Sequence, residues 1–137
     1  MPNGSDLTLS GFRALEEPLQ KVDGIIRRFA ESIQATIQEN YHGHPSRSVI
    51  VESQDGIRRS ISIQLVKPTA QSRRSGYNYA FTLGAGKKIG GQAYQWHCIF
   101  RERKTIPAGK RELTNLLGQC WKKVRSVREA DLEPVVA

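Results

Sequence analysis

The order of hydrophobic patterns along this 137-residue chain predicts an α+β protein. A spacing of three to four residues between apolar positions occurs near each end of the chain, and alternation of period two fills the middle. The links between the alternating segments are mostly of hairpin length, which favours an antiparallel meander with helices on its apolar face. We therefore expect a two-layer sandwich of order α-β-β-β-β-α, in which a four-stranded antiparallel meander packs on two helices.

The first helix is predicted from Leu15 onward by apolar residues that fall on one helical stripe. Pro18 fits its first turn, where a missing N–H costs little. The helix should end in the segment 40–45, because Gly43 and Pro45 both stop helices. The stripe consists of Leu15, Leu19, Val22, Ile26, Phe29, Ile33 and Ile37.

Four strands are expected to follow. Asp55-Gly56 is a pair favoured in tight hairpin turns and should join the first two. Residues 67–76, rich in Pro, Ser and Arg, should form a loop before the third. Between the third and fourth, Gly84 to Gly91 has the glycines and lysines of a phosphate loop, but no Ser or Thr follows the lysines. We expect a flexible hairpin loop with a basic tip there. The predicted strands cover residues 48–52, 57–65, 77–83 and 94–100.

The last helix begins after Pro107 and Gly109 and carries a second apolar stripe. We expect a single domain over residues 12–129, preceded by a flexible N-terminal arm, 1–11, and followed by a flexible acidic tail, 130–137. The stripe consists of Leu113, Leu116, Leu117, Cys120, Trp121, Val124 and Val127.

Charge is unevenly distributed along the chain. The net charge is +8, but residues 57–128 contain sixteen Lys and Arg against only Glu102 and Glu112, a net of +14. The flanking segments, 1–56 and 129–137, each carry −3. Such an asymmetry points to an anionic partner. The alternative is dispersed charge that only keeps the protein in solution.

Most of the basic residues come in pairs at predicted strand ends and loops, where they can meet at one rim of the sheet and neutralise phosphates. Small hydroxyls and amides on the polar face of the sheet suit a phosphate backbone or a partner subunit, and the alternative is a solvated face. The candidate binding residues for nucleic acid or another anionic partner are Arg58, Arg59, Arg73, Arg74, Lys87, Lys88, Arg101, Arg103 and Lys104.

No catalytic or metal site is predicted. His97 and Cys98 are adjacent on a strand, so their side chains point to opposite faces and cannot act as a thiol and base pair. Cys98 and Cys120 share the phase of the apolar residues, which favours a core role for both. His42 and His44 lack the further ligands of a structural metal site, unless His97 folds close to them. The aromatic residues also share the core phase, so base stacking is not expected.

These observations predict a small basic binding protein that engages RNA or DNA through its phosphates, with little sequence preference and no cofactor. The alternative is a protein-interaction module, such as an accessory, inhibitor or secretion-associated protein, that docks on an acidic protein or forms a homodimer through its sheet face. An enzyme is the least favoured class. Two cysteines are too few for a disulfide framework, and no apolar stretch is long enough to cross a bilayer, so we expect a cytoplasmic protein.

Overall fold

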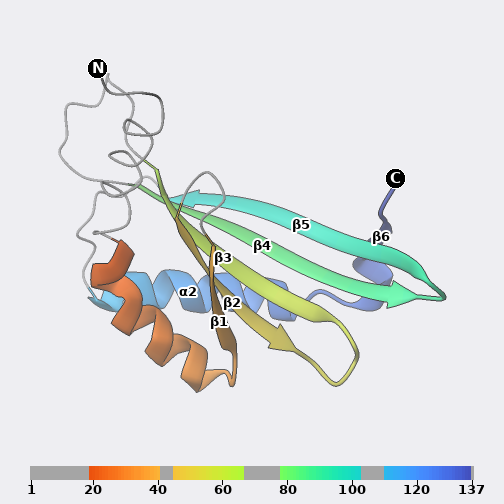
Figure 1. Cartoon of the computed structure of the whole chain (residues 1–137), viewed down its shortest axis with the longest axis horizontal. Helices are drawn as coiled ribbons and strands as arrows, with labels where there is room; N and C mark the ends of the chain where they lie inside the picture. Colours follow the sequence, from red (N-terminus) through yellow and green to blue (C-terminus); the bar gives the residue numbers. More distant parts are fainter. Residues whose placement is uncertain (1–18, 41–44, 67–77, 103–109, 137) are drawn as a thin grey trace, which may run out of the picture.

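The computed structural model describes residues 19–40, 45–66, 78–102 and 110–136, and in this part of the chain two helices pack on a six-stranded antiparallel sheet (Figure 1). The sheet is a meander, since the order of its strands follows the order of the chain. The α+β prediction is confirmed, but the prediction of four strands is wrong. The first helix is described over residues 19–32, and the other elements are β1 (Thr36–Asn40), β2 (Ser46–Glu52), β3 (Arg58–Val66), β4 (Asn78–Ile89), β5 (Gln92–Glu102), α2 (Lys110–Arg125), the 3-10 turn η1 (Glu129–Asp131) and β6 (Glu133–Pro134).

Strand β1 occupies residues that the helical period assigned to the first helix. The helix ends in a Schellman motif, in which the Ala35 N–H donates to the Ala30 carbonyl at 2.8 Å and the Gln34 N–H donates to the Glu31 carbonyl at 3.2 Å. Gln34 takes the left-handed position with a φ of 56°. The sequence pattern missed this end because a glutamine holds the place where glycine is usual. Ile37 matches the helical spacing but pairs with Val49 across the sheet.

The glycine-rich segment is a strand for most of its length, so the predicted loop over 84–91 is also wrong. Strand β4 runs on to Ile89, and only Gly90 and Gly91 form the turn, with φ values of 58° and 82°. Positive φ at both central residues is what a tight hairpin needs, and Gly-Gly provides it without strain. Glycines 84 and 86 therefore lie within the sheet, paired with both neighbouring strands.

The chain ends on the far edge of the sheet. Residues 130–137, expected as a tail, include β6, which pairs with β5 through Tyr94–Pro134 and Gln95–Glu133. The Val135 N–H donates to the Ala93 carbonyl at 2.9 Å. From Trp96 onward, the edge of β5 that faces away from β4 has no partner strand among the described residues.

Both helices cover the same face of the sheet. Leu19 and Ile26 of the first helix share one buried cluster with Leu117 of α2 and with Ile61 and Leu83 of the sheet. A smaller cluster of Ile57, Ala85, Val127 and Leu132 closes the far end of this face. Neither described helix packs on the other face of the sheet, which we call the uncovered face. Because strand side chains alternate, this face is polar along most of its length. No helix in the described ranges is long and apolar enough to cross a membrane.

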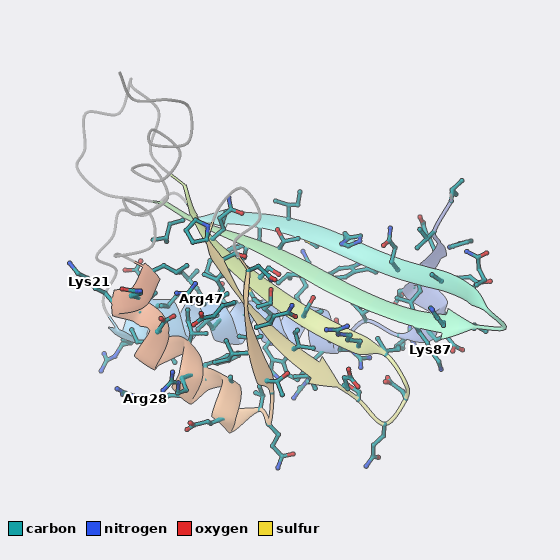
Figure 2. All side chains as sticks on the ribbon, viewed as in Figure 1. Lys21, Arg28, Arg47 and Lys87 are labelled. Carbon is teal, nitrogen blue, oxygen red and sulfur yellow. The ribbon has the colours of Figure 1, made fainter. Side chains whose placement is uncertain are left out.

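A buried arginine fixes the first helix to the sheet. Arg47 in β2 is 1% exposed, and its Nε donates to Asp23 Oδ1 of the helix at 2.9 Å. Its Nη2 reaches Asp23 Oδ2 at 3.4 Å, and Glu39 of β1 lies 3.7 Å from Nε. Figure 2 shows Arg47 between the sheet and this helix, whereas Lys21 and Arg28 project outward from the helix. A buried charge needs such a partner, so the pair fixes where the helix can dock.

The Gln34 backbone predicts a stabilising substitution. Gln34→Gly should raise the free energy of unfolding by about 0.5–1 kcal/mol, because glycine adopts a φ of 56° without the steric cost of a Cβ. Urea denaturation measures the change. Gln38→Gly in β1 is the control and should destabilise the protein by a similar amount. A loss of stability in both variants would contradict the assigned end of the helix.

Candidate functional site

The uncovered face of the sheet contains an open depression of about 750 Å³. We call it the sheet trough and define it by six residues from three strands: Arg58 and Ser60 of β3, Gly84 and Gly86 of β4, and Gln95 and His97 of β5. A concave surface of this size is in the range of ligand-binding sites. Its lining also includes Ser48, Ile50, Glu52, Lys88 and Val135.

Strand register arranges these residues in two rows. Ser60, Gly84 and His97 are directly paired and form one row. Arg58, Gly86 and Gln95 form the next row, two residues along each strand. All six lie on the same face because residues two apart on a strand point the same way.

The two glycines form the floor of the sheet trough. A Cβ at position 84 would lie 3.0 Å from Ser60 Oγ and 3.9 Å from His97 Nδ1, so these two side chains stand on either side of bare backbone. A Cβ at position 86 would meet only the Tyr94 carbonyl oxygen, at 3.5 Å. A ligand can therefore approach the backbone more closely here than at neighbouring positions that carry side chains.

One end of the sheet trough is cationic. Arg58 is exposed, and its ion pair with Glu52 is long, at 4.0 Å, and exposed on both sides. Lys88 follows Gly86 on the same face and is exposed, with no ion pair in the described part of the chain. Exposed pairs such as Arg58–Glu52 contribute little, so both cations are available to an anion.

The rest of the lining described here, including Gln95 in the row of Arg58, is neutral and rich in hydrogen-bonding groups. Ser48, at its margin, accepts a hydrogen bond from Asn40 Nδ2 at 3.2 Å, and its hydroxyl lies 2.9 Å from that of Ser62. Ser60, Gln95 and His97 make no side-chain hydrogen bond to other described residues. Their donors and acceptors are therefore open to a ligand.

Arg59, a predicted binding residue, lies inside the protein. Its side chain is on the covered face and the residue is 5% exposed. The guanidinium donates to the carbonyls of Val124 and Val127 at the end of α2, to Ser53 Oγ at 2.8 Å, and to both carboxylate oxygens of Asp55 at 3.2 and 3.0 Å. All of its nitrogens are used in holding α2 to the β2–β3 hairpin, so we remove Arg59 from the candidate surface.

Lys87, another predicted residue, also has internal partners. Its Nζ donates to the Asp55 carbonyl at 2.8 Å and lies 2.8 Å from Glu129 Oε1. Figure 2 shows it at the end of the sheet far from the first helix. The lysine joins β4, the hairpin and η1, so its charge is largely neutralised in place.

The remaining predicted residues are not described at the level of their side chains. Arg73, Arg74, Arg103 and Lys104 lie outside the described residues. Arg101 belongs to β5 and pairs with Ala80, which puts it on the uncovered face, but its side chain is not described. Of the nine predicted residues, Arg58, Lys87 and Lys88 line the depression, and Lys87 is the one of the three whose amino group is held by internal partners.

Sequence reasoning undervalued the neutral lining of the sheet trough. Ser60, Gln95 and His97 were expected on the polar face from their alternation, but they were not proposed as binding residues. The sequence did not place Gly84 and Gly86 in a strand, because their segment resembled a loop. The alternation continues through Leu83, Ala85 and Lys87 up to Gly90-Gly91, and this pattern could have predicted the longer strand.

Other exposed cations lie on the helical layer, on the opposite side of the protein. On α2 they include Arg111, Lys122 and Arg125. The remaining exposed basic residues of this layer and the turn after it are Lys21, Arg27, Arg28, Lys123 and Arg128. The sheet trough lies on the opposite face of the sheet from these cations.

The two cysteines are placed as expected. Cys98 packs half-buried against the main core, and His97 is exposed on the opposite face. Burial raises the pKa of Cys120 to about 12, so its thiol stays protonated at neutral pH and is a poor nucleophile. Phe81, Trp96, Phe100 and Trp121 also pack in or against this core.

Metal ligands do not gather in the described ranges, where no group of three or more His, Cys, Asp or Glu side chains could hold an ion. His42 and His44 lie outside those ranges, so their position relative to His97 is not described.

Comparison with known proteins adds no family to this geometry. No protein-family model matches the chain, and neither the curated proteins nor the solved structures include a significant match. A functional assignment therefore depends on the site itself.

The internal role of Arg59 can be tested against its exposed neighbour. Arg59→Ala should lower the free energy of unfolding by about 2–3 kcal/mol, because it removes the charged donor that the Val124 and Val127 carbonyls share with the Asp55 carboxylate. Arg58→Ala should change it by no more than about 0.5 kcal/mol. Chemical denaturation of both variants measures the difference, and equal effects would contradict the assigned roles.

The Asp55 carboxylate predicts a pH dependence. Hydrogen bonds from Arg59 and from the Ile57 N–H lower the pKa of Asp55 below its ordinary value of 3.8. The stability that Asp55 contributes is therefore fully present above that value and is lost as the pH falls through the lower pKa of the folded state. The difference in unfolding free energy between the wild type and Asp55→Asn should narrow over this range. Glu52→Gln, in the same hairpin, is the control, and a gap that stays constant down to about pH 2 would contradict the prediction.

Proposed function

We propose that this protein is a binding module that holds nucleic acid by its phosphate backbone across the uncovered face of the sheet, with little sequence preference. The observation that carries the proposal is an open depression bordered by two exposed cations: Lys88, and Arg58, whose ion pair with Glu52 is long and exposed. A phosphate between them would replace the weak contact of Arg58 with Glu52 by charge-assisted hydrogen bonds.

The composition of this face also supports phosphate contacts. Hydroxyl, amide and imidazole groups of Ser60, Gln95 and His97 can donate to phosphate oxygens, and such contacts position a strand without reading its sequence. The described aromatic side chains that could stack on bases pack on the covered face or in the helical layer. Affinity would then come mainly from charge, and it would be sensitive to salt.

An interaction with an acidic protein, or with a second copy of the chain, is the second candidate. Ile99 is 68% exposed on the uncovered face, in the part of β5 that pairs with β4 but has no described partner strand on its outer edge. An exposed apolar side chain beside an open sheet edge is a feature of strand pairing between subunits. This observation does not account for the cations at the sheet trough, so we place nucleic acid first.

Charge reversal tests the proposal. The double variant Arg58→Glu with Lys88→Glu should weaken binding to a mixed-sequence RNA or DNA strand about tenfold or more, and should reduce the slope of log K against log salt by about 1–2, as expected for two lost phosphate contacts. Fluorescence anisotropy at about 50 and 200 mM salt measures both quantities.

The matched control reverses two exposed cations of the first helix, Lys21→Glu with Arg28→Glu, and changes the net charge equally. It should retain most of the binding. Equal losses in the two variants, or a larger loss in the control, would overturn the assignment of the surface. Absence of binding by the wild type at low salt would overturn the proposed function and leave the protein-interaction candidate.

A further inference from the structure

The sheet trough is chemically asymmetric along the strands. Arg58 and Lys88 make one end cationic, and Ser60 and His97 make the other end neutral and able to form hydrogen bonds. Successive residues on one face of a strand are separated by about 7 Å, so the two ends lie within the length of a single nucleotide. A nucleotide has the same asymmetry, since an anionic phosphate is joined to a neutral base with a flat face and a polar edge.

The two glycines lie at different ends of the sheet trough, Gly84 beside Ser60 at the neutral end and Gly86 beside Arg58 at the cationic end. Gly84 carries no side chain, and Ser60 Oγ and His97 Nδ1 lie 3.0 and 3.9 Å from where a Cβ would be, so the edge of a base placed above this position could reach both atoms. The polar edge of the ring would then meet the hydroxyl and the imidazole. The same two groups can also donate to phosphate oxygens, and a strand that lacks its bases distinguishes the two uses.

We infer that the sheet trough seats one unpaired nucleotide, with its base over Gly84 between Ser60 and His97 and its phosphate at Arg58 and Lys88. The inference rests on the proposed function and narrows its ligand to single-stranded nucleic acid. In a duplex both faces of a base are stacked and its edge is paired, so the base could not enter the depression.

The test compares three labelled probes by anisotropy at one salt concentration: a short single strand, an abasic strand of the same length, and a hairpin duplex. The wild type should bind the single strand about three- to tenfold more tightly than the abasic strand, the value of one or two hydrogen bonds, and more tightly than the duplex. The abasic strand keeps every phosphate, so this ratio reports the base alone.

Gly84→Val should place a side chain over the floor of the sheet trough. The affinity for the single strand should then fall to the affinity for the abasic strand, and the affinity for the abasic strand should not change. Because the new Cβ would lie 3.0 Å from Ser60 Oγ, His97→Ala provides a second variant at an exposed position and should reduce the same ratio. Thr82→Val is the matched control, on the same strand and face but outside the sheet trough, and should leave the ratio unchanged.

The outcomes separate the two proposals. Equal binding of single and abasic strands by the wild type, or a ratio unaffected by both Gly84→Val and His97→Ala, would overturn the nucleotide seat while phosphate binding stands. No binding of any probe would overturn the proposed function as well. A higher affinity for the duplex than for the single strand would overturn the nucleotide seat alone.

Discussion

The arrangement of this protein depends on a buried guanidinium at the junction of the sheet and the last helix. Arg59 reaches from β3 to the carbonyl of Val124 in α2 and to that of Val127 just after it, and it holds Asp55 through both carboxylate oxygens. A positive charge is also favourable at this end of a helix dipole. The hairpin, the sheet and α2 therefore meet at one side chain. Arg47 does the same for the first helix through Asp23. Each helix is thus positioned on the apolar face of the sheet by hydrogen bonds from one buried arginine.

These two arginines change how the positive charge of the chain should be understood. Residues 57–128 carry a large basic excess, but strand alternation divides adjacent basic residues between the two faces of the sheet. Arg59 and Lys87 point to the covered face and have acidic partners, whereas Arg58 and Lys88 point to the uncovered face and border the sheet trough. One member of each pair stabilises the fold and the other is free to bind. The charge available to a partner is therefore smaller and more local than the net charge indicates.

Much of the architecture could be predicted from local patterns. The Asp55-Gly56 hairpin and the alternation of Ile61, Ile63 and Leu65 placed β2 and β3, because the turn type and the apolar face are encoded within a few residues. The apolar stripe of the last helix was predicted in the same way, from spacing within one segment. The first helix was predicted too long, since Ile37 fits a helical period while a single left-handed residue, Gln34, ends the helix before it. The candidate site was only partly predicted: Arg58 and Lys88 were selected for their charge, but Gly84 and Gly86 were assigned to a loop.

The amino-acid sequence was sufficient for the α+β class, for the core faces of the middle strands and for the basic excess, because each depends on periodicity or composition. The number of strands, the burial of Arg59 and the existence of the sheet trough required the folded chain. Strand β1 and strand β6 are short and lack strong alternation, so they form where a longer neighbour offers unpaired backbone groups. Arg59 meets Val124 and Val127 across more than sixty residues of chain. The sheet trough joins β3, β4 and β5 through register, and register is a property of paired strands that no single segment contains.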